Sequence, residues 1–351
     1  MSPPSRPLLL LAAAAALALR AASAESASCG ADGVCTSPLI LVASATATTG
    51  AQAVAALSAA GARVRAMVRK LDDPRAAPLK ALPGVELVAG DFDDAASVAA
   101  ALSGTQRALL VSGAFAYEQF ERESLFCEAA AAAGLEVVVR VGTGSFLTKA
   151  GTKGAYGRAH HGVEAFVASM GYPHITLHPN WFTSNWLGNA AEAKASGTIT
   201  LPVRGDGPRR FAFIDPRDVG GAAAAVLMLP SPDLRPLIAK AHLELHGPAA
   251  VNFVDVAAAL SGAVGYPIKI NTVDRDAWAN VLVGYGIPRV FATSFLETVE
   301  QIDGVVPRGY PADTVSSTPM MTETSPELLK FYQPRFTIAD WAEANKAAFA
   351  K

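Results

Sequence analysis

The chain has 351 residues, of which 51% are hydrophobic and 17% charged. It is therefore too apolar to be disordered and long enough for two domains, or for one large domain with an added lobe. Its 29 Lys and Arg balance 31 Asp and Glu, a net charge of −2, so no basic excess exists to attract nucleic acid or an acidic membrane. We expect no transmembrane helix in the mature chain, because no apolar run approaches the roughly 18 residues required.

Residues 1–24 are typical of a secretory signal peptide. Arg6 precedes an apolar core at Leu8–Leu19, and Ala22-Ser23-Ala24 forms a small-residue cleavage site. We predict cleavage before Glu25, followed by a linker over 25–36; the alternative is an Ala-rich tail that is never removed. The signal directs the chain into the secretory pathway or out of the cell, or begins a two-part route into an organelle such as a plastid.

The three cysteines and the paired histidines do not indicate a metal site. Cys29 and Cys35 lie close together and could form a small disulfide loop in an oxidising compartment. Cys127 falls within an apolar helical pattern and is expected in the core. His160 and His161 are neighbours that point about 100° apart on a helix, so they cannot easily share one ion. We predict no metal.

Short buried strands alternate with helices from residue 37 onward. The strands are predicted at Pro38–Ala43, Arg63–Val68, Val85–Val88, Ala108–Ser112, Glu136–Val141 and His174–Leu177, and helices among them at Gly50–Ala60, Tyr117–Ala133 and Gly157–Met170. Apolar strands that alternate with helices predict a parallel sheet covered on both faces. The predicted fold class is a doubly wound α/β Rossmann domain over 37–179.

The pattern changes after Pro179, and residues 180–351 are predicted to form a smaller substrate lobe. Trp181, Phe182 and Trp186 cluster there, and helices follow at Val219–Met228, Val254–Val264 and Ile338–Ala350. A segment at about 205–230 is expected to return to the first domain. Residues Thr314–Pro326 lack periodicity and predict a surface loop.

The first strand-to-helix turn is a degenerate dinucleotide-binding turn. Such turns carry three glycines, but here Ser44 and Ala47 replace the first two and only Gly50 is present. If Ser44 adopts a left-handed conformation, the cost is on the order of 1 kcal/mol. The helix N-terminus still offers free amides and a positive dipole to a diphosphate, beside the hydroxyls of Thr46, Thr48 and Thr49.

The second strand ends at Arg69-Lys70, where an NAD-binding protein would carry an acidic residue. A basic pair suits the 2′-phosphate of NADP; the alternative is a solvated strand end.

The third and fourth strands also end in candidate cofactor contacts. Asp91 and Phe92 follow the third strand where an adenine could lie, although a helix N-cap at Asp93 or Asp94 explains these carboxylates equally well. Ser112 and Gly113 follow the fourth strand and are expected to contact the same cofactor.

The sequence resembles the NmrA-like branch of the atypical short-chain dehydrogenase/reductases. The matching stretches are Leu39–Val42 with the degenerate turn, Arg65–Arg69, Gly90-Asp91, Tyr156–His160 with Val163-Glu164, His178–Phe182, Asp215–Val219 and Leu245–Pro248. The resemblance implies a Rossmann domain that binds NAD(P)H and a small C-terminal lobe. Members of the family include quinone and other small-molecule reductases, and regulators that bind the nucleotide without turnover.

Three features depart from the family pattern. The first two turn glycines are missing, the Arg usually found before Pro179 is His178, and no Tyr-x-x-x-Lys pair occurs at the catalytic helix. Tyr156 and His160 stand four apart on one helical face, so protonated His160 could supply part of the electrostatic role of the lysine, more weakly at neutral pH. The alternative is that Tyr156 is a half-buried packing residue.

Substrate contacts are expected after the fifth and sixth strands. Thr143 and Ser145 could hydrogen-bond a substrate carbonyl, and Thr143 is also a candidate cofactor contact. Asn180, Trp181 and Phe182 would lie at the carboxyl ends of the strands, where the two rings would form an aromatic wall for a flat substrate. The alternative is core packing of Trp181 and Phe182 between the lobes. Asp215 and Asp218 are interpreted as loop and helix-cap residues.

The sequence therefore predicts an NADPH-dependent reductase that passes hydride to a small carbonyl or quinone-type substrate. The alternative is a non-catalytic NADP(H)-binding sensor or interaction protein, and a third interpretation is a fold that has lost its cofactor. The expected partner is a small molecule, and oligomeric state is left open.

Overall fold

The computed structural model describes residues 37–112, 118–152, 154–202, 210–284, 288–290, 292–294, 296 and 323–351. The predicted signal peptide, the linker with Cys29 and Cys35, Gly113, and most of the predicted loop over 314–326 lie outside the described residues. No helix among the described residues is long and apolar enough to cross a membrane.

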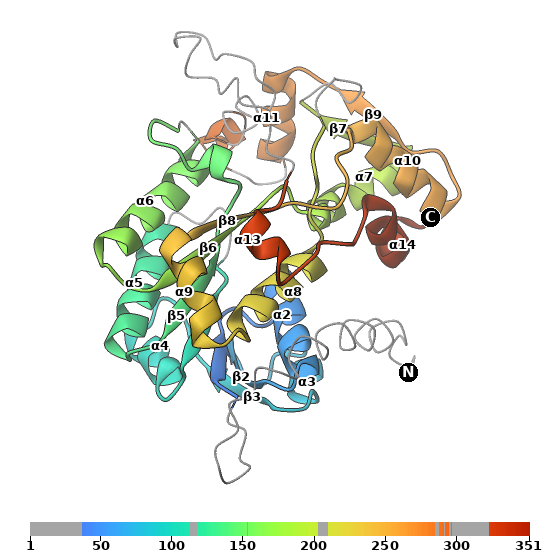
Figure 1. Cartoon of the computed structure of the whole chain (residues 1–351). Helices are drawn as coiled ribbons and strands as arrows, with labels where there is room; N and C mark the ends of the chain where they lie inside the picture. Colours follow the sequence, from blue (N-terminus) through green and yellow to red (C-terminus); the bar gives the residue numbers. More distant parts are fainter. Residues whose placement is uncertain are drawn as a thin grey trace.

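The core of the fold is a seven-stranded sheet with the order β3-β2-β1-β4-β5-β6-β8, in which every pairing is parallel (Figure 1). Its strands are β1 (Leu39–Val42), β2 (Arg63–Val68), β3 (Val85–Ala89), β4 (Arg107–Leu110), β5 (Val137–Val141), β6 (His174–Pro179) and β8 (His242–Leu245). The sheet confirms the predicted doubly wound α/β class, and the six predicted strands each match an observed one to within about two residues.

Helices cover both faces of this sheet. One face carries α4 (Ala95–Leu102), α5 (Gln119–Ala132) and α6 (Ala155–Ser169), and the other carries α2 (Thr48–Ala59), α3 (Ala77–Lys80), α8 (Pro216–Leu227), α9 (Ser231–Lys240) and α13 (Pro326–Leu329). Side chains alternate between the faces: Val137, Val139 and Val141 of β5 pack toward α2 and α8, whereas Val138 packs toward α5 and α6. Cys127 is buried in the α4–α6 layer, as predicted.

The turn between β1 and α2 has the strain that its sequence predicts. Ser44 has a φ of +48°, a left-handed conformation that a side chain adopts at a cost. Gly50 allows the helix to pass close to this turn, because a Cβ at Gly50 would lie 2.3 Å from the Ser44 carbonyl oxygen. The third turn glycine is thus required for the packing of helix on strand.

The chain after residue 180 returns to the main sheet more than once. Helix α8 packs on α2, as expected for a segment that returns, and β8 then pairs with β6 as the seventh strand. Strand β8 was not predicted, because a four-residue strand whose sequence alternates polar and apolar residues carries little periodic signal.

A second core lies to one side of the sheet (Figure 1). It contains the parallel pair β7 (Thr198–Leu201) and β9 (Lys269–Thr272), the helices α7 (Ala190–Ser196), α10 (Phe253–Val264) and α14 (Ile338–Phe349), and the short 3₁₀ helices η1 (Ser145–Leu147) and η2 (Thr183–Asn189). Helix α11 (Arg275–Gly284) packs in a separate small cluster around Ala279. Five aromatic side chains pack together in the second core and are called the aromatic cluster: Trp181, Trp186, Phe211, Phe213 and Phe253.

Asp215 and Asp218 have structural roles at the start of α8, which agrees with their interpretation as loop and helix-cap residues. Asp215 caps α8 by accepting the Arg217 amide at 2.8 Å. Asp218 is fully buried and accepts hydrogen bonds from the Tyr332 hydroxyl at 2.8 Å and the Phe336 amide at 3.0 Å. Burial raises the pKa of Asp218 to about 6.

The close packing of α8 on α2 gives a test of the fold. A Cβ at Gly220 of α8 would lie 2.6 Å from the Ala53 backbone nitrogen, whereas nothing lies within 4 Å of a Cβ at Gly262 of α10. Gly220→Ala should lower the free energy of unfolding by about 1–3 kcal/mol through overpacking. Gly262→Ala should raise it by about 0.5–1 kcal/mol through helix propensity. Urea denaturation measures both, and equal effects would refute the close approach.

Candidate active site

A layer of polar side chains lies between the sheet and helices α5 and α6, where an apolar core would be expected. We call it the polar layer; its members come from β5, β6, β8, α5 and α6 and are Arg140, His178, Glu244, Glu123, His160 and Glu164. All six are buried. Buried charges require partners, so the contacts within the layer determine which of its members are charged.

Arg140 of β5 is the central cation of the polar layer. Its Nε donates to Glu123, its Nη2 donates to His160 Nδ1 at 2.7 Å, and its Nη1 lies 3.5 Å from Glu164 Oε1. Glu123 also accepts from Ser112 Oγ and from Gln119 Nε2 at 2.8 Å. The sequence predicts that Ser112 contacts the cofactor, whereas the structure shows its hydroxyl donating a hydrogen bond to Glu123 within the polar layer.

His160 is neutral in this environment, which corrects the role predicted for it. Burial and the positive charge of Arg140 lower the pKa of His160 well below its usual value. Its Nδ1 accepts a hydrogen bond from Arg140, as a neutral imidazole can. The expectation of a protonated His160 beside Tyr156 is wrong, and the positive charge in this part of the site belongs to Arg140.

Tyr156 lies where the polar layer meets the aromatic cluster. It occupies the first turn of α6, its ring contacts the His160 ring edge-on at 4.6 Å between centroids, and it packs against the second core. Its hydroxyl is hydrogen-bonded to the Thr143 side chain. Burial raises the pKa of Tyr156, against the opposing effects of Thr143 and Arg140, so the phenol is protonated at neutral pH.

Thr143 and Ser145 follow β5 as predicted and both contact the polar layer. The Thr143 carbonyl accepts from His178 Nδ1 at 2.7 Å, and the Ser145 hydroxyl is hydrogen-bonded to Glu244. Glu244 also lies 3.1 Å from His246 Nε2. These contacts hold the end of β5 against β6 and β8.

Asn180, Trp181 and Phe182 do not form one continuous aromatic wall. Asn180 is buried; its Nδ2 lies 2.8 Å from His246 Nδ1, and its Oδ1 accepts the Trp181 amide at 2.7 Å. Phe182 packs on the main core, whereas Trp181 joins the second core and stacks on Trp186 with 6.3 Å between centroids. Both rings are therefore packed against a core, as the packing interpretation of Trp181 and Phe182 expects. Trp181 is only half-buried and remains a candidate for substrate contact.

The β1–α2 turn presents free donors at the start of α2. The side chain of the N-cap residue Ala47 makes no cap hydrogen bond, and the amides of Thr48, Thr49 and Gly50 have no hydrogen-bond partner among the described residues. The side chains of Ser44, Thr46 and Ala47 are partly exposed rather than packed into the core. Three unpaired amides at a helix N-terminus form an anion-binding arrangement.

The ends of β2 and β3 differ in how firmly their side chains are held. Arg69 and Lys70 are exposed and make no ion pair within the part of the chain that the structure describes. Asp91 Oδ1 accepts the Asp93 amide at 3.1 Å, and the Phe92 ring contacts Phe126 at 5.9 Å. The N-cap alternative is correct for Asp94, which caps α4.

Sequence reasoning did not identify Arg140, Glu123 or Gln119. The available signal was a lone arginine in the otherwise apolar strand Val137–Val141, since a buried arginine requires a buried partner.

A seven-stranded parallel sheet, wound in this order and with unpaired amides at the first helix, defines an α/β protein of the Rossmann type. A sequence model of the NmrA-like family matches residues 36–337, and the chain belongs to this family.

Individual proteins resemble the chain over most of its length. It is 27% identical to an NAD(P)H azoreductase of Xenophilus azovorans over 89% of this chain and 99% of that protein. An NADPH-dependent quinone oxidoreductase of Escherichia coli, solved with NADPH, has a TM-score of 0.66 at 22% identity and covers 87% of this chain and 99% of its own. The negative transcriptional regulator NmrA in complex with NADP has a TM-score of 0.64 at 18% identity, over 88% and 94% of the two chains. The solved structures share the fold of this protein.

The polar layer predicts a large cost for removing one charge. Glu123→Gln should lower the free energy of unfolding by about 3 kcal/mol, because Arg140 loses its closest buried partner. Glu128→Gln on the exposed side of the same helix should change it by less than about 0.5 kcal/mol. Urea denaturation of both variants checks this, and similar stabilities would show that Arg140 does not depend on Glu123.

Proposed function

We propose that this protein is an NADPH-dependent reductase of a small electrophilic substrate, such as a quinone or an azo compound. The observation that carries the proposal is the protonated Tyr156–Thr143 pair at the carboxyl end of β5, beside the buried cation Arg140. Ligands of open parallel sheets bind at this edge. The activities for which the azoreductase and the quinone oxidoreductase are named support the same class of reaction.

The residues at the β1–α2 turn fit a dinucleotide. The unpaired amides of Thr48, Thr49 and Gly50 would hold the pyrophosphate, and the exposed Arg69 and Lys70 would hold the 2′-phosphate that distinguishes NADP from NAD. Ser44 keeps the turn tight in place of the first glycine, and Ala47 adds only one methyl group. When bound, NADPH would supply the hydride for the reduction.

The residues of this chain would supply the proton. Tyr156 is protonated at neutral pH and would donate to the substrate oxygen or nitrogen that gains negative charge. Thr143 orients the phenol, and Arg140 provides a fixed positive charge that favours its deprotonation during the reaction. Trp181 is the half-buried member of the aromatic cluster and would contact a flat apolar substrate, while the buried members hold its ring in place.

The cofactor assignment is tested by a charge deletion. Arg69→Ala should weaken NADPH binding by at least about tenfold, because a charged hydrogen bond to phosphate is lost, and should leave NADH binding nearly unchanged. Lys269→Ala, at an exposed position of β9, is the matched control. Calorimetric titration measures both affinities; equal losses for NADPH and NADH would refute the 2′-phosphate role.

The proton-donor role is tested by removing one oxygen. Tyr156→Phe should lower kcat for a quinone or azo substrate by about 10²–10⁴-fold while the affinity for NADPH stays the same. Tyr172→Phe removes a phenol that donates to the Leu135 carbonyl at 2.9 Å and should leave kcat unchanged. Steady-state NADPH oxidation provides the measurement, and an unchanged kcat in Tyr156→Phe would exclude this proton donor.

A second candidate function is an NADP(H)-binding sensor without turnover. The left-handed Ser44 in the turn, and a neutral His160 where a cationic lysine is usual, favour it. The regulator NmrA, solved with NADP, has the same fold. The sensor is favoured over the reductase if this protein binds NADPH but does not oxidise it with any quinone, azo compound or aldehyde in a test panel.

A further inference from the structure

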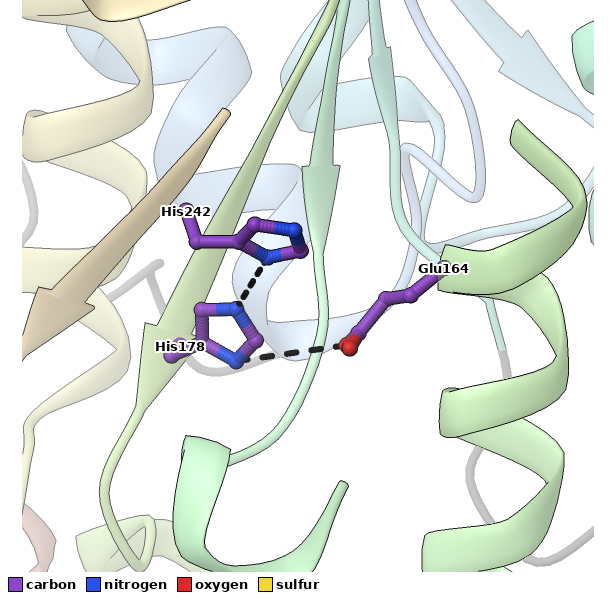
Figure 2. Close-up of side chains that lie close together, drawn as sticks. All are labelled: Glu164, His178 and His242. Carbon is purple, nitrogen blue, oxygen red and sulfur yellow. Dashed lines mark hydrogen bonds and ion pairs between the residues drawn. The ribbon is translucent and has the colours of Figure 1, made fainter. Parts of the chain in front are cut away.

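Two histidines and a glutamate converge at the edge of the polar layer nearest β8. They are His178 of β6, His242 of β8 and Glu164 of α6, and Figure 2 shows their side chains pointing toward one another. Each residue offers one nitrogen or oxygen atom that could bind a metal ion, and these three atoms all lie within 4.8 Å of one another. His178 Nε2 is 2.9 Å from His242 Nδ1, and His178 Nδ1 is 4.0 Å from Glu164 Oε1.

The hydrogen bonding of His178 determines which nitrogen is available. Its Nδ1 lies 2.7 Å from the Thr143 carbonyl oxygen, which can only accept, so Nδ1 carries the hydrogen. The lone pair of the neutral ring is then on Nε2, directed at His242. Metal-binding histidines are typically oriented in this way, with the second ring nitrogen donating to a backbone carbonyl.

Unpaired polar atoms surround the same three residues. Thr176 Oγ1 and His174 Nε2 are buried and have no hydrogen-bond partner among the described residues. Thr176 is the register partner of His242 across β6 and β8, and the His174 ring lies 6.4 Å from the His242 ring. A buried polar atom without a partner costs about 1–3 kcal/mol of folding free energy. An ion bound at this face of β6, together with its water, would supply partners for these atoms.

The charge of the region also favours a cation. Three carboxylates are buried in this region, and two of them, Glu123 and Glu164, pair with the single guanidinium of Arg140, whereas Glu244 pairs with His246. The charge of Glu244 acts on Glu164, His178 and His242. Burial raises the pKa of Glu164 to about 7. With Glu164 ionised and the imidazoles neutral, the group carries an excess of two negative charges, which one divalent ion would balance, although Arg140 competes for Glu164 at 3.5 Å.

We propose that Glu164, His178 and His242 bind one Zn²⁺ ion. Two imidazoles and one carboxylate suit Zn²⁺ better than Mg²⁺ or Ca²⁺, which prefer oxygen ligands. Tetrahedral Zn²⁺ ligands lie about 3.3 Å apart, so side-chain movements of about 1.5 Å would complete the site. The hydrogen of His242 moves from Nδ1 to Nε2 on binding, and the exposed His242 leaves a fourth position open to solvent.

The test measures Zn²⁺ binding by the untagged full-length chain, in which Cys29 and Cys35 are replaced by serine so that their thiolates do not contribute. Competition with a chromophoric chelator should give one Zn²⁺ per chain, and Co²⁺ in its place should give the visible absorption of a tetrahedral ion. His242→Ala should weaken binding by at least about a hundredfold, and Glu164→Gln should weaken it in the same direction.

His161→Ala, on the same helix as Glu164 but outside the cluster, should bind Zn²⁺ as the parent chain does. Zn²⁺ should also raise the melting temperature of the parent chain and not that of His242→Ala. The proposal is overturned if the parent chain takes up no Zn²⁺ at micromolar concentrations, or if His242→Ala binds it as tightly as His161→Ala does. Neither result depends on NADPH or on turnover.

Discussion

The buried guanidinium of Arg140 is the interaction on which the rest of the site depends. A charge in the middle of a parallel sheet is tolerated only when partners surround it, and Glu123, His160 and Glu164 do so from two helices. Because these partners belong to α5 and α6, the charge also determines how both helices sit on β5. Tyr156 stands on the first turn of α6, so its position follows from the same network.

The two cores meet where this network ends. The main core holds the sheet between its helices, and the second core is built around the aromatic cluster. Tyr156 contacts both the polar layer and the second core. A substrate held against the aromatic cluster would therefore lie beside a protonated phenol and within the field of a fixed cation, and a reductase needs this combination at the acceptor atom.

The sequence predicts the sheet well because its central strands β1, β4 and β5 are fully buried and rich in valine, leucine and isoleucine. Gly50 could also be assigned correctly, since a Cβ at this position would lie only 2.3 Å from the Ser44 carbonyl oxygen and glycine alone avoids that clash. The short β8 and the pair β7–β9 escaped prediction because four residues with polar alternation carry too little periodicity. The pairing of Arg140 with Glu123 could not be predicted either, because it depends on which helix covers which strand.

The substitution of His178 for the expected arginine shows how one residue changes the site. An arginine there would add a second fixed cation, whereas His178 is neutral and joins His242 and Glu164 in a cluster that lacks a cation of its own. Burial lowers the pKa of His178 to about 4, which keeps its lone pair available.

We infer that the amides opening α2 hold a dinucleotide whose reactive end reaches Tyr156. A crystal structure of the chain grown with NADPH tests it most directly. The diphosphate should lie within hydrogen-bond distance of the Thr48, Thr49 and Gly50 amides, with the nicotinamide beside the Tyr156 hydroxyl. A saturated crystal in which the Ser44 or Ala47 side chain closes this turn and no dinucleotide is bound would contradict it.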